Sequence, residues 1–281
     1  MDLIRLSQFP SVAANSIATL VTSECFDKSI HALVFELGGT VFTKAQINSI
    51  NVRLDGKDIV PIISGTNLQT ANSYDGLPTD AAYLIYFFGE PTAQTIRGQH
   101  LGDLDQSIYR KPLEIRVDIG AATAPTLQMY AWVSVPKLQM GVGFTPFDAA
   151  VFRAMIRTIV QPAGAVTRAS YNVNYGSSPG ARIRQVNFFH TNLTSVDYKK
   201  NSITKHDNIS IALNSSLAKQ YARVPQSGLY VLDRVLDGNQ GEAETTLNPD
   251  GQVWNQQLSL TTSAADTINV YTDVHAVWQQ I

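Results

Sequence analysis

One segment of the sequence matches a pattern used by serine hydrolases, Gly176-Ser-Ser-Pro-Gly180. In those enzymes the serine stands on a sharp turn between a strand and a helix, which exposes its hydroxyl to the substrate. Here Pro179 and Gly180 lead into the segment Arg182 to Phe189, which is typical of a strand. We therefore interpret the segment as a surface turn and predict no catalytic residue in it.

The histidines offer no local spacing for a transition metal. None occurs as H-x-H, as H-E-x-x-H or beside a pair of cysteines, the arrangements that zinc and iron sites use. The five lie at positions 31, 100, 190, 206 and 275. His31, His190 and His275 fall in predicted strands, where we expect hydrogen-bonded structural roles. The metal ligands of the chain, if any, are left unassigned.

Two other patterns point away from cofactors. Gly141-Val-Gly143 lacks the third glycine and the strand-to-helix context of a dinucleotide loop, so we interpret it as a linker. Asp103 and Asp105 are close in sequence but are too few for a helix-loop-helix calcium site. The one cysteine, Cys25, lies in apolar surroundings and is predicted to be a core residue, not a nucleophile. We predict that no cofactor is required.

Composition favours assembly over binding to charged partners. The 281-residue chain carries a formal net charge of −2, with 16% charged residues. Soluble domains usually have about 25% charged residues, and interface cores tend to exclude charge. No run rich in Lys or Arg is present, so we predict no direct binding to nucleic acid. The sequence shows neither a secretory leader nor an apolar stretch long enough for a membrane span, so we expect synthesis in the cytoplasm.

The elements that carry these residues are predicted to be strands. Turn-forming pairs such as Asp55-Gly56 and Asp75-Gly76 separate short apolar or alternating runs in the first half of the chain. The runs are Ile17 to Val21, His31 to Leu37, Ile47 to Leu54, Tyr83 to Phe88, Leu113 to Ile119 and Leu127 to Val135. Without longer helical segments between them, this pattern indicates an all-β sandwich or barrel.

The second half repeats the order of the first, which predicts an internal duplication. The matching segments are Val52 to Ile59 with Val196 to Ile203, Tyr83 to Phe88 with Leu229 to Arg234, Leu113 to Ile115 with Leu258 to Leu260, and Thr126 to Val133 with Thr267 to Val274. Both halves also carry a helix-compatible segment at equivalent places, Asn67 to Tyr74 and Ser216 to Tyr221.

A helix is predicted between the two copies, from Pro146 to Val160. Thr145 can cap it, Pro146 suits its first turn and Asp148 completes a capping box. Apolar residues follow at helical spacing, so we expect this helix to pack between or beneath the barrels. The predicted domains are residues 1–140, a linker with a helix at 141–163, and residues 164–281.

The aromatic residues of the predicted strands are expected to form the two cores. They are Tyr83, Tyr86, Phe87, Phe88, Tyr130, Trp132, Phe188, Phe189, Tyr230, Tyr271 and Trp278.

Three stretches resemble the major coat protein of corticoviruses, icosahedral phages of marine bacteria with an internal lipid membrane. They are Leu6 to Asn15, the strand pair His31 to Leu37 and Ile47 to Ile59 with its Val-Arg-Leu-Asp-Gly core, and the closing Val277-Trp278. The likeness runs nearly end to end and includes Arg182 to Asn187 and Ser195 to Tyr198. It is weakest in the loops, especially Ala163 to Gly180 and Gly238 to Gly251.

The resemblance implies two tandem eight-stranded jelly rolls and a homotrimeric capsomer of pseudo-hexagonal outline. It further implies neighbouring capsomers, penton and membrane-associated virion proteins as partners, an internal membrane nearby, and a place in the capsid shell of the virion. Calcium is implied as a possible structural ion, with no ligands assigned.

Two alternatives to a structural capsid protein stay open at this point. Polar loops and exposed aromatic residues would suit a carbohydrate-binding jelly roll of the lectin or fibre type. A β-sandwich hydrolase would rest on the Gly176 to Gly180 pattern alone.

Overall fold

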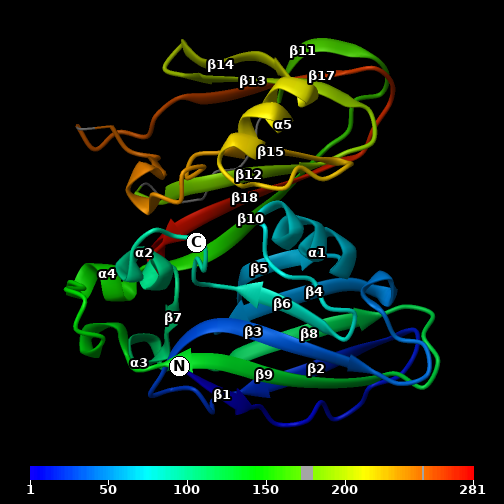
Figure 1. The fold of residues 1–281 in the computed structure, drawn as a ribbon, viewed down its shortest axis with the longest axis vertical. Helices are drawn as coiled ribbons and strands as arrows, with labels where there is room; N and C mark the ends of the chain where they lie inside the picture. Colours follow the sequence, from blue (N-terminus) through cyan, green and yellow to red (C-terminus); the bar gives the residue numbers. More distant parts are fainter. Residues whose placement is uncertain (172–179, 249) are drawn as a thin grey trace.

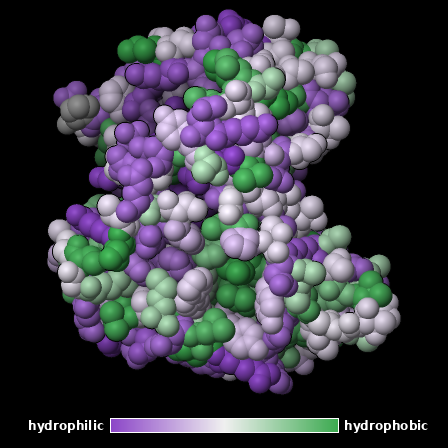
Figure 2. All heavy atoms as spheres, in the orientation of Figure 1, coloured by the Kyte–Doolittle hydropathy of each residue, from purple (hydrophilic) through white to green (hydrophobic). Residues whose placement is uncertain are grey.

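The computed structural model describes residues 1–171, 180–248 and 250–281. Two β-barrels are stacked along the longest axis of the molecule (Figure 1). The N-terminus lies at the first barrel, and the C-terminus lies near the level where the two barrels meet. In the orientation of Figure 2 the molecule narrows at that junction. The expectation of two tandem barrels is confirmed.

The first barrel consists of two facing antiparallel sheets, one of five strands and one of four. The five-stranded sheet has the order β1 (Asp2–Arg5), β9 (Thr126–Ser134), β3 (Ser29–Gly38) and β6 (Tyr83–Phe87), with the short β7 (Leu104–Asp105) beside β3. The four-stranded sheet has the order β2 (Ser16–Thr22), β8 (Leu113–Ile119), β4 (Ile47–Leu54) and β5 (Lys57–Ile63). All six strands predicted in this half are present.

The second barrel repeats this topology strand for strand. Its five-stranded sheet has the order β10 (Phe152–Val160), β18 (Ile268–Ala276), β12 (Arg182–Phe189) and β15 (Leu229–Asp233), with the short β16 (Glu244–Thr245) beside β12. Its four-stranded sheet has the order β11 (Val166–Tyr171), β17 (Gln256–Thr262), β13 (Leu193–Lys200) and β14 (Ile203–Ser210). The identical strand order supports the duplication inferred from the sequence.

Local sequence explains the matching hairpins. Asp55 and Gly56 both have positive φ, 49° and 82°, which suits a two-residue turn of the primed type between β4 and β5. Asn201 and Ser202 have φ of 48° and 64° at the same place between β13 and β14. Because such turns match the twist of the strands, the two hairpins take the same form from different residues.

Helices follow the same plan. Helix α1 (Gly65–Tyr74) follows β5 and helix α5 (Ile211–Gln220) follows β14, and each is capped by a serine, Ser64 or Ser210. Shorter helical segments occur in the connections: η1 (Lys44–Gln46), α2 (Ile96–Leu101), α3 (Gln106–Tyr109), η2 (Lys137–Gln139), α4 (Pro146–Ala150), η3 (Gln240–Glu242) and η4 (Trp278–Gln280). Both helix-compatible segments predicted between the strands are therefore helical.

The helix predicted from Pro146 to Val160 is wrong beyond its first turns. The capping box of Thr145 and Asp148 forms, but α4 ends at Ala150 and strand β10 begins at Phe152. Most of β10 is buried because one face packs in the second barrel and the other meets the first barrel. A strand covered on both faces loses the strict alternation of apolar and polar residues, and the apolar residues of β10 also satisfy helical spacing. The first strand of the second barrel thus lies within the segment predicted as a linker.

Most of the expected core residues are buried, Cys25 included. Strand β8 alternates strictly, and Leu113, Ile115, Val117 and Ile119 face the interior. Each such side chain contributes about 1.5–3 kcal/mol by leaving water. Two aromatic predictions are wrong: Tyr83 is 40% exposed, and Trp278 lies in η4 and not in a strand. Tyr130 and Trp132 are only partly buried.

Candidate functional site: the junction between the barrels

The two barrels meet where β5 and α1 of the first face β10 and β18 of the second (Figure 1). The Tyr271 hydroxyl on β18 donates a hydrogen bond to the Ile62 carbonyl on β5 at 2.8 Å. The Val224 amide donates to the Tyr74 carbonyl at the end of α1, also at 2.8 Å. These bonds fix the backbone of one barrel against the other.

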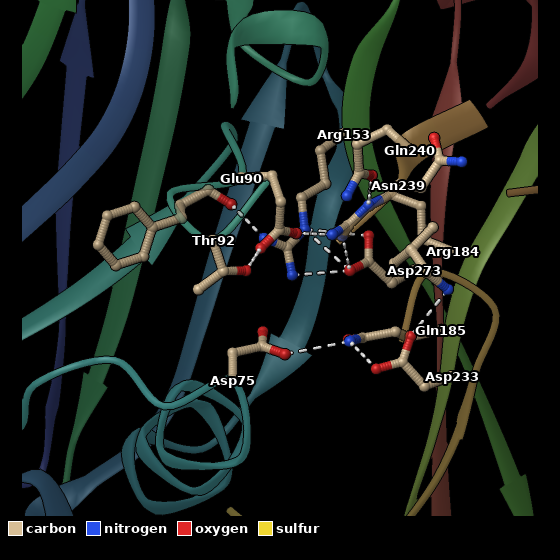
Figure 3. A network of polar contacts seen from close by, with 12 residues as sticks. Asp75, Glu90, Thr92, Arg153, Arg184, Gln185, Asp233, Asn239, Gln240 and Asp273 are labelled. Atoms are coloured by element: carbon tan, nitrogen blue, oxygen red, sulfur yellow. Dashed lines mark hydrogen bonds and ion pairs between the residues drawn. The ribbon is translucent and has the colours of Figure 1, made fainter. Parts of the chain in front are cut away.

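A buried cluster of charged side chains crosses the junction (Figure 3). Arg153 forms a two-pronged ion pair with Asp273, with Nε 2.9 Å and Nη2 2.7 Å from Oδ2, and it also donates to the Phe87 carbonyl at 3.1 Å. Arg184 contacts Asp273 at 2.6 Å and also forms an ion pair with Glu90. Glu90 comes from the first barrel, whereas the other three charges come from the second. The cluster therefore balances two positive and two negative charges across the junction.

A second polar cluster lies beside the first. Arg223 contacts Asp75 at 3.3 Å and Asp233 at 3.2 Å. Gln185 donates to the same two carboxylates, at 3.1 Å each (Figure 3). Thr92 links the clusters, because its hydroxyl donates to Glu90 and accepts from Arg223. Asp75 and Thr92 belong to the first barrel, so this cluster also joins the two domains.

Electrostatics explain why these buried charged side chains occur in pairs of opposite sign. Burial by itself would lower the pKa of Arg153, but the carboxylate of Asp273 holds that pKa above its ordinary value. Burial raises the pKa of Asp233, and the Arg223 guanidinium opposes that rise. A buried charge without a partner costs several kcal/mol, so the paired arrangement is favoured over displaced ones. The junction thus holds the barrels in one relative orientation.

Lys137 adds a third connection. Its side chain is fully buried, and its ammonium donates to the carbonyls of Leu101 at 2.7 Å and Val151 at 2.5 Å. Burial lowers the pKa of Lys137 to about 8, although Asp103 and Asp105 oppose the fall. Lys137 therefore ties the end of the first barrel to the segment that enters β10.

A β-bulge aims Arg184 into the junction. The register of β12 against β18 shifts between Ile183 and Gln185, which leaves Arg184 as the extra residue. Such bulges redirect a side chain out of the regular alternation. Strand β3 has the same shift against β9, between Ile30 and Ala32, and its extra residue is His31. The two bulges occupy equivalent positions in the duplicated barrels.

His31 lies in a compact group with His100 and Asp103. Its Nδ1 is 2.8 Å from one carboxylate oxygen of Asp103, and the Nδ1 of His100 is 2.6 Å from the other. Asp103 is fully buried, and both histidines are at least nine-tenths buried. Calcium prefers six to eight oxygen donors, so a group with two nitrogens does not suit it.

The other histidines are not members of this group. His275 is buried on β18, and its pKa is lowered far below the ordinary value by burial and by the nearby charges of Arg184 and Arg153. His206 approaches the Tyr230 hydroxyl at 2.5 Å, and burial lowers its pKa to about 4. Neither ring nitrogen of His275 or of His190 has a hydrogen-bond partner among the described residues, so hydrogen-bonded roles predicted for these two are wrong. His190 also follows β12 instead of lying in it.

The remaining sequence motifs do not converge on a site. Asp103 and Asp105 have different partners, because Asp105 accepts from the Lys137 and Ser107 amides at 2.8 and 3.0 Å. Gly141-Val-Gly143 lies between η2 and α4, as expected of a linker. Within the segment Gly176 to Gly180, residues 176–179 lie outside the described residues.

Sequence reasoning missed the junction because its charges are far apart along the chain. Glu90 and Arg184 are distant in sequence, and Asp273 is more distant still. One signal was available: Arg184 and Asp273 are charged residues within predicted strands that also carry large apolar residues. A charge in a strand of that kind needs a buried partner.

No helix among the described residues is long and apolar enough to cross a membrane.

Comparison with known proteins decides the family. Residues 3–134 match the profile of the viral coat protein P2 N-terminal domain, and residues 153–278 match that of the viral coat protein P2 C-terminal domain. The chain belongs to the viral coat protein P2 family. The second match begins at β10, in agreement with the strand order of the second barrel. A search of curated protein sequences finds no match.

Solved structures with the P2 fold share the double barrel. The major capsid protein P2 of bacteriophage PM2 superposes with a TM-score of 0.79 at 18% identity, covering 100% of this chain and 99% of that one. Sulfolobus turreted icosahedral virus gives a TM-score of 0.65 at 13% identity, covering 99% and 91%. The PBCV-1 virus capsid gives 0.62 at 12% identity, covering 98% and 92%.

A P2 coat protein is a structural component of a viral capsid, so this chain has a structural role in a virion and is not an enzyme. The corticovirus resemblance and the double jelly-roll fold are confirmed. The family assignment favours the capsid over the carbohydrate-binding alternative.

Proposed function

We propose that three copies of the chain form a closed capsomer of six barrels that tiles the shell. A chain with two similar barrels can make similar contacts on both sides of each barrel. One such contact lies within the chain, at the junction. The second would join the second barrel of one copy to the first barrel of the next.

The exposure of duplicated edge strands carries this proposal. Leu3 on β1 pairs with Trp132, and Met155 on β10 pairs with Asp273. Trp132 and Asp273 are equivalent because each also pairs with the residue that follows the bulge in its barrel. Leu3 is therefore the equivalent of Met155. Met155 is 4% exposed because β10 lies in the junction, whereas Leu3 is 61% exposed. The first barrel therefore leaves bare the edge that the second barrel has covered.

The duplicated helices show the complementary contrast. Helix α1 lies at the junction, and nearly all its residues are partly or fully buried. Helix α5 is largely exposed and presents Leu213 and Leu217 on one face, and the exposed Tyr221 follows four residues later as the residue that ends the helix. Ile203 on the neighbouring β14 is exposed as well. This apolar surface on α5 and β14 is the counterpart of the one that β5 and α1 use within the chain.

These two bare surfaces fit a head-to-tail contact between copies. A contact of that kind joins different patches and gives a ring when the rotation closes. Three copies would supply six barrels, which suits a position with six neighbours in a shell.

The wider setting rests on the family resemblance and not on these surfaces. We propose neighbouring capsomers, penton and membrane-associated virion proteins as further partners, with an internal lipid membrane beneath the shell and synthesis in the host cytoplasm. Calcium is proposed as a structural ion held by oxygen donors between copies, since the buried histidine group does not suit it.

Light scattering coupled to size-exclusion chromatography tests the capsomer. We expect a mass three times the 30.7 kDa of the chain. Leu3→Asp and Leu217→Asp should each shift the protein toward monomer, because each places a charge in an apolar contact. Ile17→Asp is the matched control, since Ile17 is equally exposed but lies on β2. Variants of Leu3 and Leu217 that are as trimeric as the wild type, or a wild-type protein that stays monomeric, would contradict the proposal.

A further inference from the structure

The group of His31, His100 and Asp103 has the composition of a metal site. One donor atom from each residue lies within 4.8 Å of the other two, and all three side chains are buried. The residues come from β3, from α2 and from the connection to β7, so folding brings them together. Imidazole nitrogens with a carboxylate are the donors that zinc and similar divalent ions prefer.

The bulge in β3 is a second, independent observation. It makes His31 the extra residue in the pairing with β9, and the Phe88 and Gly89 amides both donate to its carbonyl, at 2.8 and 3.0 Å. Gly89 also leaves room for the ring, since a Cβ there would stand 2.2 Å from His31 Nδ1 and 2.5 Å from Asp103 Oδ1. The backbone is thus shaped to hold the imidazole against Asp103.

Comparison of the duplicated barrels shows what the group lacks. At the equivalent bulge of the second barrel stands Arg184, whose guanidinium neutralises buried carboxylates. In the first barrel the buried carboxylate of Asp103 contacts two imidazoles among the described residues, and an imidazole that binds a metal does so in its neutral form. A bound cation would supply there the positive charge that arginine supplies in the second barrel.

We propose that His31, His100 and Asp103 bind one divalent transition-metal ion of the zinc class. Three protein ligands leave a fourth tetrahedral position for water. Tetrahedral donors about 2.1 Å from zinc stand ~3.4 Å apart, so the two nitrogen–oxygen pairs at 2.8 and 2.6 Å must separate by roughly half an ångström or more. Coordination through Nδ1 places the imidazole proton on Nε2.

The metal would stabilise the junction between the barrels. It would tie α2 and the start of β7 to β3, next to two carbonyls that Arg153 binds. The Arg153 amide donates to the Gly102 carbonyl at 2.8 Å, and its guanidinium donates to the Phe87 carbonyl. Binding would therefore raise the stability of the very region that orients the second barrel.

Isothermal titration with ZnCl₂ tests the site on purified chain stripped of metal with a chelator. We expect one zinc ion per chain with micromolar or tighter affinity, and quenching of Trp132 fluorescence by Co²⁺, because its ring centre is 5.3 Å from that of His31. His100→Gln should weaken binding at least 100-fold and remove the quenching. His190→Gln is the matched control and should bind zinc as the wild type does.

Controls separate a loss of zinc binding at this site from a loss caused by misfolding. Circular dichroism confirms that each variant is folded, and Asp103→Asn offers a second test if His31 variants fail to fold. Equal zinc binding by the wild type and His100→Gln, or no stoichiometric binding by the wild type, would overturn the proposal. The measurement needs no assembled capsomer, so its result is independent of the trimer.

Discussion

Glu90→Gln is the perturbation that most directly tests the junction. The change keeps the size of the side chain but removes the one first-barrel charge in the cluster with Arg153, Arg184 and Asp273. Two arginines then share one carboxylate, which leaves a net positive charge in a site where Glu90 is 2% and Arg184 0% exposed. At ~4 Å and an effective dielectric constant of ~20, the lost attraction is about 4 kcal/mol. Measured losses for one partner of a buried pair are about 3–5 kcal/mol.

We therefore expect Glu90→Gln to lower the free energy of unfolding by about 3–4 kcal/mol. The midpoint of thermal unfolding should fall by roughly 6–16 °C, given about 2–4 °C per kcal/mol in a chain of this size class. Equilibrium unfolding in urea, followed by tryptophan fluorescence, measures the change. Several protein concentrations are needed because assembly adds to apparent stability.

Two further variants make the result specific. Glu114→Gln removes a carboxylate from a surface ion pair with Arg116 and should cost less than about 1 kcal/mol. Arg184→Met combined with Glu90→Gln leaves Arg153 and Asp273 balanced, so the double variant should be at least 2 kcal/mol more stable than the sum of the single losses implies. A loss below 1 kcal/mol for Glu90→Gln, or strict additivity in the double variant, would refute the reasoning.

Three other variants, with Gly164→Ala as a control for the third, probe titration and packing. The pKa of Lys137 falls on folding from 10.5 to about 8. Between these pH values the unfolded chain binds the proton more tightly, so the free energy of unfolding rises with pH by up to ~3 kcal/mol. Lys137→Met should lack this rise when unfolding in urea is measured from pH 8 to 10.5. The pKa of His206 falls on folding from 6.5 to about 4, so the free energy of unfolding decreases as the pH drops through that range. In thermal melts over this pH range, His206→Gln should lose about 1–3 kcal/mol less stability than the wild type. A variant whose stability depends on pH as the wild type's does would argue against the burial of His206. Gly102→Ala would place a Cβ 2.2 Å from the Phe88 carbonyl oxygen and should cost more than about 2 kcal/mol in urea unfolding, whereas Gly164→Ala, with open space around it, should cost less than 1.

The strands could be predicted because each local signal agrees with its environment. Leu113 to Ile119 alternates between core and surface, and Asp55-Gly56 forms the turn that its chemistry favours. The repeated order then revealed the duplication, and with it the architecture. Neither step required knowledge of contacts between distant residues.

Prediction failed where the two barrels meet. The capping box at Thr145 correctly marks a helix start, but the following residues form β10, whose two buried faces remove the alternation that identifies a strand. The charges of the junction are also assembled from distant segments, and His31 is distant along the chain from His100 and Asp103. Apart from the presence of Arg184 and Asp273 within predicted strands, no local signal marks these residues, so the folded barrels reveal them.

Electron cryo-microscopy of the assembled capsomer is the most direct test of the central claim, that the duplication lets one intrachain contact be repeated between copies. The account predicts a threefold ring in which α5 and β14 of one copy cover β1 of the next, as α1 and β5 cover β10 within the chain. A capsomer of another symmetry, or one in which Leu213, Leu217 and Leu3 all remain facing solvent, would contradict it.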